Sequence, residues 1–586
     1  MNGPAQASDI VIIGGGFAGL TAGLRATELG LRAVLLEKGV GRRYPCNSRY
    51  SGGIVHVGFR DIQRTPQELL EAVQTTTAGE ADPAQARALV ENIGRWVDWL
   101  QQHGARFMRF NMEEAYRWCM APPRALVPGL DWQGRGPDVL LSDLMDQFVA
   151  AGGIAHQGTR ALRLHMDGAI CRGVVAEQDG REIQFHARAT LIADGGFQAD
   201  RGAFSQNIGP SFEAVFQRGA ATGMGDGMRM AESVGARMTA RNVFYGHLLA
   251  KGVHENDRLW PYPELDAFAT AGVILGPDGR RFTNEAAGGI AVANELARLS
   301  DPACAVAIFD ADIWEGPGRA HRIPANPLLE QAGADIVKAP SLQALATQLG
   351  LPVAAVVETI EEHNAAIEAG NGAALRPPRE GRVAAHPIRT APFMAIRMVP
   401  GITYTMGGIA VDGSARVLST NDTPIEGLFA AGAATGGLEG GSQKGYVGGI
   451  AKAGVFGLLA AETVAQEMTQ SRAEAAPRAP SPAPSVTAHT PVSASQPQPA
   501  ASPRPEPLAT DRRDERFAML KLIVRYGRTA SGVLAALVGL GALPLLWPLL
   551  GWLSVPIASV AAGLGYVVLR SYTEMVTLIT EMLMPE

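Results

Sequence analysis

The chain has 586 residues and a mass of 61.6 kDa. A chain of this length is too long for a single hydrophobic core, so at least two packed domains are expected. Its formal net charge of −6 offers no basic surface, and the sequence therefore predicts no binding to nucleic acid. The cysteines are too dispersed for a disulfide framework or for cysteine-ligated zinc or iron–sulfur clusters, and no metal site is predicted; they are Cys46, Cys119, Cys171 and Cys304. Residues 1–8 lack the basic and apolar regions of a signal peptide, so we expect no export.

A strand, a glycine-rich turn and a helix open the chain. Residues 9–13 are apolar, residues 14–19 read GGGFAG, and residues 20–29 continue with helical spacing. In such a unit the glycines allow a tight turn and a close approach of backbone to pyrophosphate, while the helix N-terminus faces the negative charge. A second strand, residues 32–36, ends in an acid near the offset expected for a carboxylate that accepts ribose hydroxyls. The pattern predicts a dinucleotide site rather than an ordinary glycine-rich turn, formed by Gly14, Gly16, Phe17, Ala18, Gly19, Glu37 and Lys38.

Three later segments favour FAD over NAD as the dinucleotide. Residues 47–53 form a polar loop whose small side chains and bare amides suit phosphate and the flavin edge, although an ordinary surface loop is the alternative. Residues 190–197 are a strand ending in a glycine pair, and the glycine-dense residues 432–449 precede an apolar helix. Together these segments suit backbone approach to one long cofactor. The residues assigned to it here are Asn47, Ser48, Ser51, Gly52, Gly53, Ala193, Gly195, Gly196, Gly432 and Gly448.

The C-terminal part changes composition twice. Residues 471–511 are dominated by Ala, Pro and Ser, which predicts a disordered, extended linker. Residues 529–570 contain an uncharged apolar run long enough for two spans, and the basic residues at both ends predict a transmembrane helical hairpin with both ends in the cytoplasm. Residues 571–586 are expected to form a C-terminal helix. A single span with a surface helix, or a buried hairpin, are the alternatives. The sequence thus predicts contact with membrane lipid, with the N-terminal part on the cytoplasmic side of the cytoplasmic membrane.

Four motifs carry a family resemblance. They are ATGMGDG at residues 221–227, GRRFTNE at 279–285, PGITYTMGG at 400–408 and GLFAAG at 427–432. With the N-terminal fingerprint, they make the chain resemble the flavoprotein superfamily of fumarate reductases and succinate dehydrogenases. Tricarballylate dehydrogenases and ketosteroid dehydrogenases are the members it resembles most.

The resemblance implies an α/β fold with a split, glutathione-reductase-like Rossmann domain for FAD, residues 1–207 and 396–466. An α+β cap domain, residues 208–395, is inserted between the halves, and substrate binds between the two domains. Asp226 joins the implied cofactor residues. The histidine that carries covalent flavin in succinate dehydrogenases aligns near Cys46, so non-covalent FAD is expected.

Departures from the family pattern select the candidate catalytic residues. Trp314 stands where fumarate reductases have their proton-donating arginine, and fumarate reduction is therefore not expected. Tyr404 replaces a substrate-binding histidine, and a tyrosine can donate to a carbonyl or, with a lowered pKa, accept a proton. The resemblance also implies site roles for His247, Glu285 and Lys444, each of which has an ordinary structural role as its alternative.

The sequence predicts a membrane-tethered FAD-dependent dehydrogenase that introduces a C=C bond next to a carboxylate or carbonyl of a small, tricarballylate-like substrate. We find no second dinucleotide fingerprint, so the electrons are expected to pass to a quinone or a membrane partner. Two alternatives stay open. One is a dehydrogenase of ketosteroids or other cyclic ketones, and the other is a flavin electron-transfer subunit without an organic substrate.

Overall fold

The computed structural model describes residues 7–110, 113–125, 127–320 and 323–475. The predicted membrane hairpin (529–570) and C-terminal helix (571–586) lie outside these residues, as does most of the predicted linker. The first residues of that linker, up to Ala475, belong instead to helix α14 (Gly449–Ala475), which corrects the predicted start of the linker. No helix in the described ranges has the length and apolarity needed to cross a bilayer.

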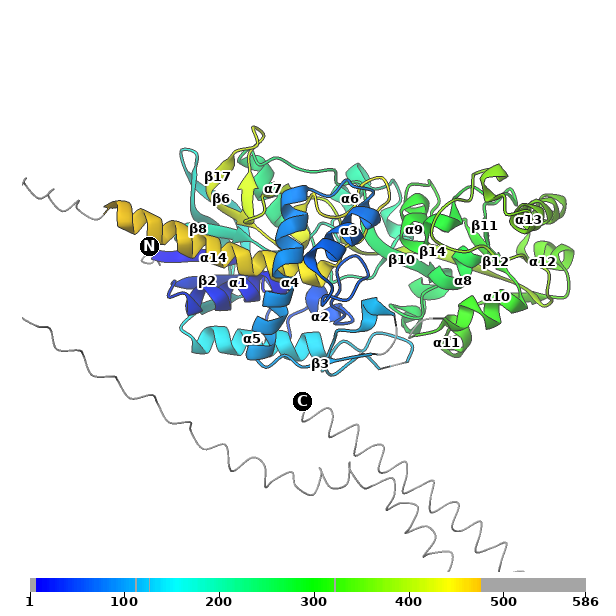
Figure 1. Cartoon of the computed structure of the whole chain (residues 1–586), viewed down its shortest axis with the longest axis horizontal. Helices are drawn as coiled ribbons and strands as arrows, with labels where there is room; N and C mark the ends of the chain where they lie inside the picture. The colour runs from blue at the N-terminus through cyan, green and yellow to red at the C-terminus, as the bar shows by residue number, and fades with distance from the viewer. Residues whose placement is uncertain (1–6, 111–112, 126, 321–322, 476–586) are drawn as a thin grey trace, which may run out of the picture. The chain divides into compact units, whose positions relative to one another are not determined.

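The first domain, which takes strands from both ends of the described chain, is built on an eight-stranded sheet (Figure 1). Its strands follow the order β16-β17-β8-β1-β2-β5, while β7 pairs with β8 and β6 pairs with β7. They are β1 (Ala7–Ile13), β2 (Ala33–Glu37), β5 (Ile154–Gln157), β6 (Thr159–Asp167), β7 (Ile170–Gln178), β8 (Arg181–Ile192), β16 (Arg416–Leu418) and β17 (Pro424–Ala430). The predicted first strand is confirmed. Ile10, Val11 and Ile12 are fully buried, as expected for a parallel strand covered on both faces.

Helices pack against this sheet and against one another. Helix α1 (Phe17–Glu28) packs against α14 and against α5 (Gly136–Ala150), and α14 also packs against α4 (Pro83–Gln102). Further elements of this domain are α2 (Asn47–Tyr50), α3 (Pro66–Thr77), β3 (Phe107–Met108), β4 (Cys119–Met120), α6 (Arg201–Asn207), β15 (Ile409–Ala410) and β18 (Thr435–Gly436).

Parallel pairing brings together the three glycine-containing turns that follow β1, β8 and β17. In the register, Ile13 of β1 lies opposite Ile192 of β8, and Ile192 lies opposite Ala430 of β17. All three strands therefore end at one edge of the sheet, each just before a glycine-containing turn. The carboxyl edge of a parallel sheet is where open α/β folds bind their ligands.

The cap, at the right in Figure 1, is a six-stranded sheet with helices around it. Its strands are β9 (Phe216–Gln217), β10 (Phe244–Ala250), β11 (Val273–Leu275), β12 (Val306–Phe309), β13 (Ile336–Ala339) and the long β14 (Phe393–Thr405). Its helices are α8 (Asp266–Ala271), α9 (Gly289–Ala297), α10 (Ala311–Glu315), α11 (Ala325–Ala332), α12 (Leu342–Leu349) and α13 (Val353–Glu368).

The observed boundaries differ from the predicted ones in two places. Strand β14 pairs with cap strands from Phe393 to Thr405, so the cap sheet continues past the predicted boundary at residue 396. Helix α7 (Asp226–Ser233), inside the predicted cap range, packs instead against β6 of the first sheet. Motif order alone could not locate these crossings because both depend on long-range pairing.

Gly19 provides a test of the close helix–strand packing. A Cβ at this position would lie 1.9 Å from the carbonyl oxygen of Gly14, a backbone atom that cannot rotate away. We expect Gly19→Ala to destabilise the protein by about 1–3 kcal/mol and to reduce bound flavin, measured by thermal melting and visible absorbance.

The matched control is Gly94→Ala in α4, where an added Cβ meets nothing within 4 Å. Since alanine is the better helix former, this variant should be neutral or more stable by up to about 1 kcal/mol. Equal stability losses in both variants would contradict the packing argument.

Candidate active site

The turn after β1 is held by the predicted acid, Glu37. One carboxylate oxygen accepts the amide hydrogen of Gly15 at 2.8 Å, and the other accepts that of Gly39 at 2.7 Å. Each oxygen keeps a second lone pair for an external donor such as a ribose hydroxyl. The hydroxyl of Tyr44 donates to the carbonyl oxygen of Gly15 at 2.6 Å and fixes the turn from the other side.

A cavity runs from this turn along the carboxyl edge of the sheet and into the cap. Most predicted cofactor residues line it: Gly14, Gly16, Phe17, Ala18, Glu37, Lys38, Asn47, Ser48, Ser51, Gly52, Ala193, Gly195, Asp226 and Gly432. Four others lie just outside its wall: Gly19, Gly53, Gly196 and Gly448. Gly53, for example, faces Met120 and Pro137, which occupy the space where a side chain would stand.

The residues present fit FAD. Two buried acceptors in the cavity wall, Asp194 Oδ1 and Gln198 Oε1, have no hydrogen-bond partner within the described part of the chain. Burial raises the pKa of Asp194 to about 6. Such unpaired polar atoms are costly unless a ligand satisfies them, and a flavin dinucleotide carries hydroxyl and ring N–H donors along its whole length.

Asp226 contributes charge to this wall through an ion-pair network. Its carboxylate lies 3.2 Å from Lys38 Nζ and 2.7 Å from Arg160 Nη2. Burial opposes ionisation of Asp226, but the hydrogen bond from Arg160 and the charge of Lys38 outweigh it and lower the pKa. Both predicted residues, Lys38 and Asp226, are therefore brought together.

Asn47 joins the cofactor loop to both chain crossings into the cap. Its amide nitrogen donates to the carbonyl oxygen of Thr403 at 2.9 Å, and its amide oxygen accepts the N–H of Ala220 at 2.6 Å. The side chain predicted to touch the cofactor also sets the position of the cap relative to the loop.

At the cap end, three tyrosines meet in the cavity. The rings of Tyr245 and Tyr446 stack with centroids 3.9 Å apart, and Tyr404 lies 5.5 Å from Tyr245. The Tyr446 hydroxyl accepts the amide hydrogen of Gly449 at 3.3 Å and so keeps its own hydrogen for another acceptor. The Tyr404 hydroxyl approaches the same glycine, where a Cβ would lie 2.8 Å from it. Two phenolic hydroxyls thus converge at the N-terminus of α14.

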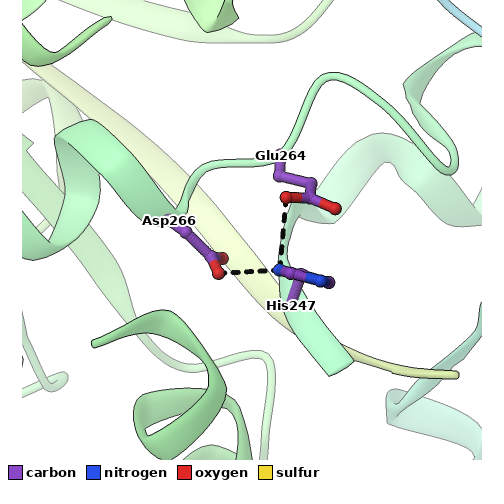
Figure 2. A group of neighbouring side chains, drawn as sticks. All are labelled: His247, Glu264 and Asp266. Atoms are coloured by element: carbon purple, nitrogen blue, oxygen red, sulfur yellow. Dashed lines mark hydrogen bonds and ion pairs between the residues drawn. The ribbon is translucent and has the colours of Figure 1, made fainter. Parts of the chain in front are cut away.

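His247 lies beside this cluster between two carboxylates, as Figure 2 shows. Its Nδ1 is 2.8 Å from Asp266 and 3.2 Å from Glu264. Carboxylates only accept hydrogen bonds, so Nδ1 carries a proton, and Nε2 faces the Tyr245 hydroxyl at 3.0 Å. These three groups could ligate a cation, but Arg218 already pairs with Glu264 at 2.7 Å. The arrangement orients Tyr245.

A buried carboxylate and ammonium stand behind Tyr404. The Tyr404 hydroxyl donates to Glu439 Oε2 at 3.0 Å, and Lys452 Nζ lies 3.5 Å from the same oxygen. Burial and the adjacent Glu439 raise the pKa of Tyr404 well above its ordinary value, whereas burial lowers the pKa of Lys452. The condition under which Tyr404 alone could act as a base, a lowered pKa, is therefore not met.

The cations that line the cavity are all paired with carboxylates. Lys38 and Arg160 pair with Asp226, Arg218 with Glu264, and Lys452 with Glu439. His56, which also lines the cavity, is held neutral because burial lowers its pKa to about 4. Lys38 and Arg160 share one carboxylate in the cofactor part of the wall, whereas Arg218 and Lys452 at the cap end each have their own, so the described cap end offers an anionic substrate no unpaired cation.

Two predicted catalytic residues are not brought to the cavity. Glu285 is fully buried in the cap, where it pairs with Arg281 and Arg379. Lys444 pairs with Glu295 at 2.9 Å. Neither lines the cavity, and each has a complete structural role as an ion-pair partner.

A cavity along the glycine-containing turns of the sheet, joined to a pocket lined by tyrosine hydroxyls, is typical of a flavoprotein oxidoreductase. Residues 9–448 match the model of the FAD binding domain family, and the chain belongs to this family. Its cofactor is FAD, and it is an oxidoreductase of the class that acts on CH–CH groups.

Similar proteins include reductases and dehydrogenases. The chain is 25% identical to the probable fumarate reductase Ifc3 of Shewanella frigidimarina over 483 residues, 79% of this chain and 76% of the relative. It is also 25% identical to the 4-oxocyclohexanecarboxylate 2-dehydrogenase of Sinomonas cyclohexanicum over 556 residues, 79% of this chain and 93% of the relative. The crystal structure of 3-ketosteroid delta1-dehydrogenase from Sterolibacterium denitrificans has a similar fold, with a TM-score of 0.60 and 20% identity over 79% of this chain and all of that one.

The neutral state of His56 gives a pH prediction. Its pKa falls from 6.5 in the unfolded chain to about 4 in the fold, so the stabilisation is present above pH 6.5 and is lost as the pH falls towards 4. The shift corresponds to about 3 kcal/mol. We expect His56→Asn to show a smaller loss of melting temperature than the wild type between pH 6.5 and pH 4.

His363 has a similar shift and remains in both proteins, so only the difference between them reports on His56. Parallel losses of melting temperature in the two proteins would contradict the assignment.

Proposed function

We propose that the chain is a dehydrogenase that introduces a C=C bond next to the carbonyl of a cyclic ketone. The observation that carries this proposal is the convergence of the Tyr404 and Tyr446 hydroxyls at Gly449, inside a cavity whose cations are all paired. Aromatic side chains dominate the cap end of its lining: Tyr50, Phe59, Tyr116, Tyr245, Tyr262, Tyr404 and Tyr446. Such a lining favours an apolar ring over a polyanion.

The chemistry divides between the two hydroxyls. Tyr446, with its oxygen fixed by the Gly449 amide, donates its hydrogen to the ketone oxygen and stabilises the charge that develops there. Tyr404 takes the proton from the α carbon. Bound FAD supplies the hydride acceptor for the β carbon. The name of the relative from Sinomonas cyclohexanicum, whose substrate is a ring ketone, supports this assignment.

The tricarballylate-like substrate suggested by the motifs is the less favoured reading. Three carboxylates need compensating cations, and the two cations at the cap end of the cavity, Arg218 and Lys452, are already neutralised by Glu264 and Glu439. A pure electron carrier is also disfavoured, because it has no use for a pocket with oriented hydroxyls beside its cofactor site. Burial raises the pKa of the Cys46 thiol to about 11, which keeps it protonated and supports non-covalent FAD.

Anaerobic reduction of the bound flavin distinguishes these substrates. We expect cyclohexanone-type and steroid ketones to bleach the visible flavin absorbance, because Tyr446 can polarise their carbonyl. Dicarboxylates and tricarballylate should bleach it at least about tenfold more slowly, since they must enter without a free counter-charge. Preferential bleaching by tricarballylate would reverse the assignment. Reduction by dithionite alone would favour the carrier.

The electron acceptor is proposed from the sequence. The apolar residues 529–570 and the basic residues around them support a tether to the cytoplasmic face of the cytoplasmic membrane, with a quinone or membrane protein as acceptor. We expect a chain truncated after Ala475 to keep its flavin and its ketone-dependent bleaching but to lose quinone reduction in membrane vesicles. Undiminished quinone reduction by the truncated chain would contradict the role of the tether.

A further inference from the structure

Behind Tyr404 lies an ion pair that the proposed chemistry does not yet use. The side chains of Glu439 and Lys452 are 0% and 1% exposed, and their charged atoms are 3.5 Å apart. Glu439 comes from the loop before α14 and Lys452 from the first turns of that helix. Removing two charges from water is expensive, and an apolar pair of similar volume often stabilises a fold as well or better. Stability alone therefore gives a weak reason for this pair.

The two oxygens of Glu439 have different surroundings. Oε1 accepts the amide hydrogens of Val447 at 3.1 Å and Gly448 at 3.0 Å, which fixes the carboxylate in the fold. Oε2 faces the Tyr404 hydroxyl at 3.0 Å and Lys452 Nζ at 3.5 Å. The backbone contacts hold one oxygen, and the other is directed at the phenol that lines the cavity.

Lys452 is positioned to keep this carboxylate ionised. Its ammonium group also donates to the carbonyl oxygen of Thr435 at 2.9 Å, so it is held in place by two acceptors. A nearby cation and two backbone N–H donors both favour the charged form of a buried carboxylate. An ionised Glu439 can only accept a proton, and within the described residues the one hydroxyl that hydrogen-bonds to it is that of Tyr404.

We propose that Glu439 receives the phenolic proton of Tyr404 while Tyr404 takes the α proton of the substrate, with Lys452 holding Glu439 ionised beforehand. This inference rests on the proposed function. The α C–H bond breaks and a new O–H bond forms on Tyr404. At the same time the original O–H bond of Tyr404 breaks and an O–H bond forms on Glu439 Oε2. The electron pair of the α C–H bond becomes the new C=C bond as hydride leaves the β carbon for FAD, the acceptor of this enzyme class.

The relay removes a difficulty in using Tyr404 as a base. Burial and the charge of Glu439 raise its pKa well above the ordinary range, so the phenolate form is not available at neutral pH. A neutral phenol can accept a proton only if it gives up its own in the same step. Glu439 and Lys452 act through Tyr404 and are positioning residues. The other titratable groups near the phenol are Tyr245 and Tyr446.

The test compares Glu439→Gln with wild type in the full chain, after thermal melting and flavin content have shown that both are folded. The amide keeps the shape and, through its oxygen, the hydrogen bonds from Val447 and Gly448, but the nitrogen that then faces Tyr404 is a donor and cannot accept the proton. We expect the rate of anaerobic flavin reduction by the best cyclic ketone to fall by about 10²-fold or more. Glu182→Gln is the matched control, because this exposed carboxylate pairs with Arg163 at the surface and should leave the rate unchanged.

A second readout does not depend on turnover. The phenol of Tyr404 is followed by its ultraviolet phenolate absorbance at alkaline pH, as the difference between each protein and its Tyr404→Phe partner. Loss of the neighbouring negative charge in Glu439→Gln should lower the Tyr404 pKa towards its ordinary value. The combination of an easier ionisation and a slower reaction is expected only if Glu439 must receive the proton.

Lys452→Met covers the case in which Glu439→Gln does not fold. Without the ammonium the Glu439 carboxylate loses its counter-charge, so the rate of flavin reduction should fall at neutral pH and recover as the pH is raised. A wild-type rate in Glu439→Gln, or an unshifted rate–pH profile in Lys452→Met, overturns the relay. If no ketone reduces the wild-type flavin, the proposed function fails instead. In that case an unchanged alkaline titration of Tyr404 in Glu439→Gln would separately overturn the coupling between Tyr404 and Glu439.

Discussion

The parallel pairing of β8 with β1 on one side and β17 on the other is the constraint on which the site depends. It aligns the carboxyl ends of three strands that are far apart in sequence, at Ile13, Ile192 and Ala430. Because each strand is followed by a glycine-containing turn, bare backbone lines one edge of the sheet and leaves room for a long cofactor. No single one of these turns would define the cavity.

Strand β14 transmits this geometry to the cap. It is the central strand of the second sheet, and it returns towards the cofactor loop at Thr403, where Asn47 holds it by a hydrogen bond. The next residue, Tyr404, therefore enters the cavity from the cap side while α14 supplies Gly449 from the other lobe. The reactive hydroxyls thus sit at the meeting point of two sheets, and their positions depend on both.

Local patterns in the sequence predicted the cofactor half well. The first strand, its glycine turn and Glu37 lie within one continuous unit, so spacing alone specifies their contacts. The substrate half was predicted less well, because Tyr245, Glu439 and Lys452 meet only through tertiary packing. Tyr446 and Lys452 could have been identified as site candidates from the sequence. They lie on either side of the glycines that begin an apolar helix, where a lysine is unusual.

The two misplaced catalytic candidates show how motif matching fails. Glu285 follows Arg281 by four residues. It forms ion pairs with Arg281 and Arg379 in the interior of the cap. Lys444 lies in a turn with positive φ and reaches Glu295 rather than the cavity. In each case an ion pair within the protein neutralises the side chain that the motif alone associated with substrate binding.

The most direct test of the account is the isotope effect on anaerobic flavin reduction by a cyclic ketone deuterated at the α carbon, at the β carbon or at both. If Tyr404 removes the α proton as hydride leaves the β carbon, each single label slows reduction, and Tyr404→Phe lowers the rate while flavin content is unchanged. Equal rates for labelled and unlabelled ketone at the α carbon, together with a wild-type rate in Tyr404→Phe, would contradict the central claim that this tyrosine cluster performs the proton transfer.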